Sequence, residues 1–240
     1  MNLVIDIGNT QYKLSVFNEN RMVNHRYLDD INHGFINELC DEYNITKCIF
    51  SDTRGVDFKS LRKIIPEHIS MLALTHETNL PIHINYATPE TLGKDRIAAA
   101  VGASKIYPKS NVLVIDIGTA LTIDFISEKN VFEGGIISPG QELRFKALHY
   151  FTGKLPLEQA KENTELSGNS TSTAIQYGVQ NSIIFEINEY ISRYSKQYAD
   201  LKIIITGGDA YLFDKKIKYA IFAEPFLVPI GLNTIINYND

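Results

Sequence analysis

One short phrase occurs twice in this 240-residue chain, and the repetition limits the possible folds more than any other feature. "LVIDIGNTQYK" begins at Leu3 and "VLVIDIGTALTID" begins at Val112, so Asp116 lies 110 positions after Asp6. This spacing is too long for a solenoid repeat and suits one small domain. The sequence therefore predicts two related halves that arose by duplication.

Each copy has the pattern of a β-hairpin. An apolar run leads into the Asp-x-Gly turn, and after the turn apolar residues alternate with other residues in the two-residue period of a strand. The alternating apolar positions are Tyr12, Leu14 and Val16 in the first copy, and Leu121, Ile123 and Phe125 in the second. The turn is therefore expected at the tip of the hairpin in both halves.

Strands followed by helices are expected in each half. The expected elements are a strand through Met22 and Val23, a helix over 31–43, a strand over 48–51, a helix over 57–65, a small-residue helix from Ile97, a strand from Val131, a long helix over 175–198 that "GNSTST" announces, and a final strand over 202–205. No low-complexity linker separates the halves. We therefore expect an α/β fold with domains at 1–108 and 109–240 and an active-site cleft between them.

The amino-acid composition excludes few functions, but it indicates which class of protein and which binding partners to expect. Apolar residues make up 44% and charged residues 21%, as in ordinary globular proteins, and the net charge of −5 gives no general attraction to nucleic acid or anionic membranes. No leader or membrane-spanning run is apparent, so a cytoplasmic protein is expected. Cys40 and Cys48 lack metal-ligand spacing and are interpreted as reduced thiols. The six histidines also lack such spacing and are assigned no role.

The Asp-x-Gly-x-Thr turn has two interpretations. Glycine permits close approach to a ligand, backbone N–H groups and the threonine hydroxyl can hold phosphate oxygens, and the aspartate can hold a cation. Aspartate and glycine are also simply good turn formers, which would explain a single copy. Because the whole phrase repeats, we favour a phosphate-binding turn, with Lys13 as the cation that neutralises phosphate charge.

Other phosphate motifs do not match. "GIISPGQE" has the glycine spacing of a Walker loop, but Gln141 and Glu142 stand where Lys and Ser or Thr are required, and no Gly-x-Gly-x-x-Gly occurs. "GGIISPG" and "TGGDA" are consistent either with loops close to a nucleotide or with strand-end turns.

"LGKDR" precedes the small-residue helix and also has two interpretations. Asp95 is suited to a helix N-cap or first-turn acid, and Arg96 to a surface charge. Alternatively, Arg96 binds an anionic substrate and Asp95 accepts a hydroxyl proton. From this segment alone, the purely structural interpretation is favoured.

With these motifs identified, almost the whole chain resembles the type III pantothenate kinases, members of the acetate kinase, sugar kinase and actin superfamily. "DIGNTQYK" resembles the family's phosphate motif, "LGKDR" its Gly-x-Asp-Arg motif and "DIGTALTID" its second Asp-x-Gly-Thr motif, while "GGIISPG" and "TGGDA" follow in the family's order. The resemblance implies two ribonuclease H-like, actin-like ATPase domains related by internal duplication, with ATP between them.

The resemblance also implies roles for individual residues. Asp95 is the catalytic base in this comparison, Asp116 binds a monovalent cation (K⁺ or NH₄⁺), and Asp6 lies near the Mg²⁺ that accompanies ATP. The implied ATP contacts are Asp6, Ile7, Gly8, Asn9, Thr10, Gln11, Tyr12, Lys13 and Thr119. The implied pantothenate contacts are Tyr86, Gly93, Lys94, Asp95, Arg96 and Thr171, with the hydroxyl of Thr173 as an alternative to that of Thr171.

The implied reaction is ATP-dependent phosphorylation of pantothenate to 4′-phosphopantothenate, the first step of coenzyme A biosynthesis, in a homodimer. Such transfers depend mainly on alignment and charge neutralisation, which suits a set of motifs rich in glycine, threonine and aspartate. Another small-molecule kinase of the superfamily, a nucleotide-binding regulatory protein and an actin-like filament protein remain alternatives. The intact "LGKDR" favours an enzyme over a binding module.

Overall fold

The computed structural model describes residues 1–8, 11–55 and 58–240, which form two compact units. The first unit contains Met1–Lys109, Lys129–Glu133 and Phe226–Asp240, and the second contains Ser110–Glu128 and Gly134–Pro225. The chain passes into the second unit one residue after the expected boundary at 108, whereas 129–133 and the C-terminal segment return to the first unit. The division into duplicated domains at 1–108 and 109–240 itself stays a prediction.

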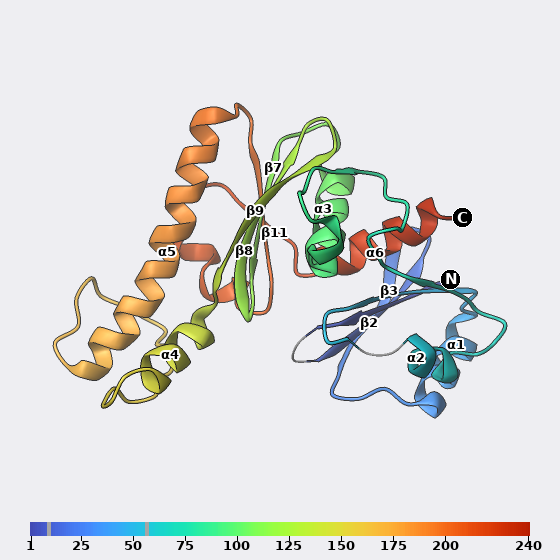
Figure 1. The fold of residues 1–240 in the computed structure, drawn as a ribbon, viewed down its shortest axis with the longest axis horizontal. Helices are drawn as coiled ribbons and strands as arrows, with labels where there is room; N and C mark the ends of the chain where they lie inside the picture. Colours follow the sequence, from blue (N-terminus) through green and yellow to red (C-terminus); the bar gives the residue numbers. More distant parts are fainter. Residues whose placement is uncertain (9–10, 56–57) are drawn as a thin grey trace. The chain divides into compact units, whose positions relative to one another are not determined.

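The first unit is built on a five-stranded sheet with the order β3-β2-β1-β4-β5 (Figure 1). Its strands are β1 (Asn2–Ile7), β2 (Tyr12–Asn18), β3 (Arg21–Leu28), β4 (Lys47–Asp52) and β5 (Ser70–Ala73). β1, β2 and β3 are antiparallel neighbours, and β4 runs parallel to β1 and β5 parallel to β4. The hairpin expected at the first motif is therefore confirmed, and it places Asp6 opposite Lys13.

Both faces of this sheet are covered. α1 (His33–Tyr43) and α2 (Phe58–Ile64) pack on the face formed by alternate β1 residues such as Leu3 and Ile5. The side chain of Val4 points the other way and is fully buried too. Because both faces of β1 are buried, its sequence is a continuous apolar run up to Asp6.

Two helices of the first unit, α3 (Lys94–Ile106) and α6 (Leu227–Tyr238), lie side by side (Figure 1). A Cβ atom on Gly102 would lie 2.4 Å from the carbonyl oxygen of Leu227, and one on Gly231 would lie 1.8 Å from that of Ala98. The two helix backbones are therefore in direct contact. Asn2 on β1 donates to the Oδ1 atoms of Asn233 and Asn237, at 2.9 and 2.7 Å, which fastens α6 to the sheet.

The second unit repeats this arrangement of strands. β7 (Val112–Ile117), β8 (Ala120–Ser127), β9 (Val131–Pro139), β10 (Lys202–Thr206) and β11 (Phe222–Ala223) follow the order β11-β10-β7-β8-β9. β7 pairs antiparallel with β8 and parallel with β10, as β1 does with β2 and β4. The short β6 (His83–Ile84) pairs with the first residues of β9, which belong to the first unit.

The helices of the second unit are α4 (Gln141–Tyr150) and the long α5 (Thr171–Gln197). Alternate residues of β7 and β8 pack against Ile183, Ile187 and Ile191 of α5. Short 3₁₀ turns occur at Pro89–Thr91, Ala210–Leu212 and Asp214–Lys216. In the described chain, no helix is both long and apolar enough to cross a membrane.

Most of the expected elements are present with small shifts of their ends. The strand expected to be the last, over 202–205, is β10, but β11 and α6 follow it. That part of the expectation was wrong, because the apolar segment 227–238 contains Pro229 and Gly231 and carries no clear helical start signal.

Candidate functional site in two parts

The carboxyl group of Asp6 lies at the end of β1 and is almost completely buried, with 3% of the residue exposed. Its Oδ2 atom is 3.5 Å from the Nζ atom of Lys13, and its Oδ1 atom is buried with no hydrogen-bond partner among the described residues. Burial raises the pKa of Asp6, the positive charge of Lys13 lowers it, and the negative charge of Asp95 raises it. Asp6, Lys13 and Asp95 therefore lie within electrostatic reach of one another.

The other residues expected to bind phosphate differ in their exposure and in the groups that are available to a ligand. The side chain of Lys13 is 39% exposed, so its ammonium group remains accessible. Ile7 is fully buried and can contribute only its backbone, and Gln11 donates to Asp29 Oδ1 at 3.3 Å. Two further expected contacts, Asn9 and Thr10, lie outside the described residues.

Gly93 is the N-cap residue of α3, and its lack of a side chain makes room for Asp95. A Cβ on Gly93 would lie 2.5 Å from Asp95 Oδ1, which accepts the backbone N–H of Arg96 at 2.8 Å. Asp95 is thus a first-turn acid, where the helix dipole stabilises its negative charge. Lys94, the variable position of the motif, is half-buried.

The side chain of Arg96 is enclosed by aromatic rings. Its Cζ atom lies 5.9 Å from the ring centroid of Tyr86 and 5.6 Å from that of Phe132, and these rings are 6.0 Å apart. Only 6% of Arg96 is exposed, so the interpretation of this residue as a surface charge was wrong. The planar guanidinium matches the geometry of a carboxylate, which makes this arginine a candidate for anion recognition. Phe132 was missed, because "VFEGG" shows only a strand pattern.

In the second unit, Asp116 is the last but one residue of β7 and pairs with Thr122 on β8 and Thr206 on β10. A Cβ on Gly207 would lie 2.4 Å from Asp116 Oδ1, so the lack of a side chain lets this backbone approach the carboxylate closely. Gly207 has a φ of +97°, which other residues rarely adopt. The "TGGDA" loop thus closes over the Asp-x-Gly turn, and the backbone N–H of Asp209 bonds to the carbonyl of Ile117 at 2.9 Å.

The "GGIISPG" segment reaches the same turn from the other side. The N–H of Gly140 donates to the carbonyl of Thr119 at 3.1 Å, and a Cβ on Gly140 would lie 2.1 Å from the carbonyl oxygen of Gly118. Thr119 itself is exposed. Three glycine-containing motifs of the sequence therefore meet at the end of β7, as expected of close-approach loops. The pKa of Asp209 nearby is raised, chiefly by burial and also by the charge of Glu142.

The two threonines at the start of α5 are distinguished by their contacts. The Thr173 hydroxyl takes part in a capping box: it accepts the backbone N–H of Ser170 at 3.1 Å, while Ser170 Oγ accepts the N–H of Thr173 at 3.2 Å. Thr171 is exposed and lies outside this network. Its hydroxyl is therefore the one available to a ligand.

Thr171 also lines a groove of about 700 Å³ between α4 and α5. Its walls are largely apolar, with Leu148, Ile175 and Val179 among the lining residues. Arg144 closes one end through an ion pair with Glu186 and hydrogen bonds to Ser138 Oγ (3.0 Å) and Ser182 Oγ (2.9 Å).

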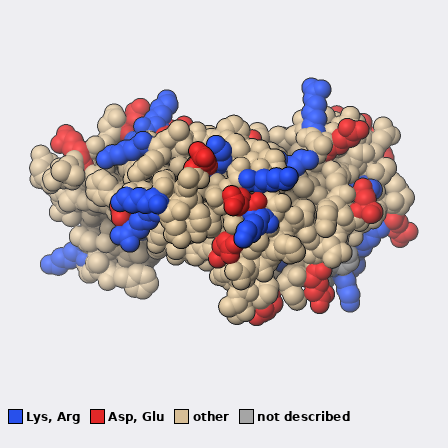
Figure 2. All heavy atoms as spheres, turned by 90° about the horizontal axis from the view of Figure 1, so that it is seen from above, with Lys and Arg blue, Asp and Glu red and all other residues tan. Residues whose placement is uncertain are grey.

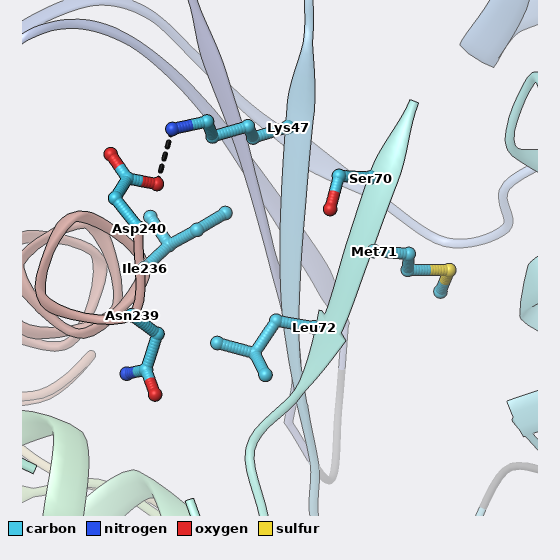
Figure 3. A pocket seen from close by; sticks show the side chains of 7 residues that line it. All are labelled: Lys47, Ser70, Met71, Leu72, Ile236, Asn239 and Asp240. Atoms are coloured by element: carbon cyan, nitrogen blue, oxygen red, sulfur yellow. Dashed lines mark hydrogen bonds and ion pairs between the residues drawn. The ribbon is translucent and has the colours of Figure 1, made fainter. Parts of the chain in front are cut away.

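A second cavity, in the first unit, contains none of the expected site residues (Figure 3). It lies between β5 and the end of α6, where Lys47 forms an ion pair with Asp240 and Leu72 points toward the helix. On the face shown in Figure 2, charged side chains of both signs are interspersed among the described residues, without an extended region of one sign.

Residues 2–193 match the family model described as type III pantothenate kinase. A type III pantothenate kinase of Cytophaga hutchinsonii is 44% identical over 239 residues, covering 100% of both chains. The chain belongs to the type III pantothenate kinase family. This kinase therefore catalyses the ATP-dependent phosphorylation of pantothenate in coenzyme A biosynthesis.

Solved structures agree on the fold of the kinase. A Campylobacter jejuni protein described as a Baf-family transcriptional activator has a TM-score of 0.66 at 23% identity, covering 99% of this chain and 98% of that one. A Sinorhizobium meliloti protein described as a 2-dehydro-3-deoxygalactonokinase has a TM-score of 0.65 at 12% identity, covering 100% and 99%. At these identities the likeness concerns the fold alone. It confirms the expected α/β fold with ribonuclease H-like halves of the actin and sugar-kinase type.

Proposed function

We propose that Asp95 is the general base of this pantothenate kinase. The observation that carries the proposal is the grouping of Asp95, Asp6 and Lys13 in the first unit, with the Arg96 guanidinium held on the next residue of α3. The Asp95 carboxylate accepts the proton of the primary hydroxyl of pantothenate as this oxygen attacks the γ-phosphorus of ATP. The bond from the γ-phosphorus to the bridging oxygen breaks, and ADP leaves.

The turn between β1 and β2 binds the ATP phosphates, through backbone N–H groups and the ammonium of Lys13. The buried Oδ1 atom of Asp6, which has no hydrogen-bond partner among the described residues, fits a divalent cation, since carboxylate oxygens are the protein ligands that Mg²⁺ prefers. Mg²⁺ that accompanies a nucleotide is commonly held by one or two carboxylates together with phosphate oxygens and water. Bound with ATP, Mg²⁺ would neutralise phosphate charge.

Pantothenate binds at the start of α3. Arg96 pairs with its carboxylate or a nearby polar group, and the half-buried ring of Tyr86 fixes the guanidinium in place. Gly93 and Lys94 complete this surface, since the absence of a side chain at Gly93 allows the substrate and Asp95 to approach each other.

Asp116 binds a monovalent cation, and Thr119 contacts ATP. The Asp116 carboxylate and the carbonyl oxygen of Ile117 converge beside Gly207, each 2.4 Å from where its Cβ would stand, and this grouping of oxygens supports a bound ion nearby. K⁺ and NH₄⁺ are suited to a site whose ligands are carboxylate and carbonyl oxygens.

A coupled assay of ADP release tests this assignment. We expect turnover only when pantothenate is present, and we expect it to fall when sodium replaces potassium in the buffer. Asp116→Asn should give the sodium-like rate in both salts, because the ion's carboxylate ligand is lost. Equal activity of the unmodified enzyme in potassium and sodium would contradict the cation site. An equal rate of ADP release with and without pantothenate would contradict the substrate assignment.

The kinase forms a homodimer through the groove between α4 and α5. Besides the apolar walls of the groove, Tyr150 and Phe151 at the end of α4 are 70% and 89% exposed, and such exposed apolar surface is typical of an interface. The Thr171 hydroxyl, at the edge of this groove, contacts pantothenate across the interface.

Sedimentation velocity provides the measurement. The unmodified protein is expected to sediment at twice the 27.1 kDa chain mass, and Phe151→Asp should shift it toward the monomer, because a carboxylate at this exposed position would be buried only in the dimer. A monomer at micromolar concentration argues against the dimer.

A further inference from the structure

The loop after β4 is joined to the phosphate-binding turn. β4 runs parallel to β1, with Asp52 opposite Ile7, so the two strands end at the same edge of the sheet. Beyond that edge, the backbone N–H and the Oγ1 hydroxyl of Thr53 both donate to the carbonyl oxygen of Ile7, at 3.1 and 3.0 Å. The next residue, Arg54, is therefore fixed beside the turn.

Arg54 contacts residues near both ends of that turn. Its Nε–H donates to the carbonyl oxygen of Gly8, and its Cζ atom lies 4.9 Å from the ring centroid of Tyr12. The backbone N–H of Arg54 is itself bonded to Asp52 Oδ1 at 2.8 Å. The guanidinium is thus held between Gly8 and Tyr12, on either side of the turn, while the residue remains exposed.

The charges of the turn leave a role for this guanidinium. Lys13 already has a carboxylate neighbour in Asp6, 3.5 Å away, so that pair brings little net positive charge to a polyanion. Arg54 has no ion pair with any carboxylate of the described residues. Among the described residues, its guanidinium donates a hydrogen bond only through the Nε–H, so none of these residues takes up the four N–H donors of the two terminal nitrogens.

We propose that Arg54 is a second phosphate-binding cation, which contacts the terminal phosphate oxygens of ATP alongside Lys13. A guanidinium presents paired N–H groups that match two phosphate oxygens, and its charge is not lost at any pH at which the enzyme folds. The proposal rests on the proposed binding of ATP phosphates by residues 6–13, and it adds a residue that the sequence motif does not contain.

Binding of ATP, inorganic triphosphate and adenosine to the intact enzyme tests the proposal by calorimetry. Arg54→Gln is expected to weaken ATP and triphosphate about tenfold, the effect of losing roughly one charge-assisted contact, and to leave adenosine unchanged. The KM for pantothenate should not move. Arg26→Gln is the matched control, because Arg26 is another exposed arginine of the first unit, stacked 5.5 Å from the ring of Phe35.

Two more variants separate the possible failures. Arg54→Lys keeps the charge but loses the bond to Gly8, so triphosphate affinity should return to within about threefold of the unmodified enzyme. Equal losses in Arg54→Lys and Arg54→Gln would mean that Arg54 only holds the turn, and the proposal is then overturned. If Lys13→Ala weakens triphosphate and Arg54→Gln does not, only the role of Arg54 is wrong. If neither does, the phosphate-binding turn itself is wrongly assigned.

Discussion

Asp95→Asn is expected to lower kcat by a factor of about 100 to 10,000, the usual contribution of a positioned general base. The amide is close to the carboxylate in size and shape, and its oxygen can still accept the N–H of Arg96 that Asp95 Oδ1 accepts at 2.8 Å. The start of α3 should therefore keep its geometry. What the variant loses is the ability to take up the hydroxyl proton.

The measurement is steady-state ADP release combined with calorimetric binding of ATP. Affinity for ATP should stay within a few fold, since the phosphates bind at the turn between β1 and β2. Glu90→Gln is the control, as Glu90 is an exposed acid only five positions earlier. Near-normal turnover of Asp95→Asn would remove this residue from the role of base and leave Asp95 with its structural role at the start of α3.

Gly231→Ala is expected to destabilise the protein by about 3 kcal/mol, at the upper end of the usual cost of overpacking. A Cβ at this position would lie 1.8 Å from the carbonyl oxygen of Ala98 and 3.0 Å from the backbone nitrogen of Gly102. Both obstacles are backbone atoms of α3, so no side chain can rotate out of the way. To accommodate the added methyl group, α3 and α6 must move apart, and side chains packed between the two helices then lose contact with each other.

Thermal unfolding should show this as a fall in Tm of about 6–12 °C for a chain of this size. Because α3 carries Asp95 and Arg96 in its first turn, kcat should fall too, since a shift of about 1 Å in reacting groups can cost on the order of 100-fold. Gly34→Ala in α1 is the control: its Cβ would have its nearest neighbour at 3.5 Å, an ordinary contact. An unchanged Tm for Gly231→Ala would mean that the close crossing of α3 and α6 does not exist.

Local sequence patterns predicted much of the fold. The run from Leu3 to Ile5 is apolar because both faces of β1 are buried. The alternation after the turn correctly predicted a strand, although both faces of β2 are buried from Leu14 to Phe17. The segment "GNSTST" indicated the start of α5, and the structure shows that Ser170 and Thr173 of this segment form a capping box. These signals succeed because each depends on residues only a few positions apart.

Only some residues of the candidate site were predicted from the sequence. Asp6, Lys13 and Asp95 were identified from motifs, and the structure brings them together. Asn9 and Thr10 fall outside the described residues, so their roles stay predictions. Arg54 follows β4 in an ordinary turn sequence, and nothing near it in the chain indicates that it reaches Gly8 and Tyr12.

The sequence by itself determined the repeated strand-turn-strand units, the family and the residues of its motifs, because these depend on local spacing. Only the tertiary structure decided that Arg96 is buried between two aromatic rings, that three glycine motifs meet at the end of β7, and that α6 packs directly on α3. These features join segments far apart in the chain. Gly102 and Gly231 matter because each leaves room for the backbone of the other helix, and a single sequence does not reveal which distant backbone will occupy that room.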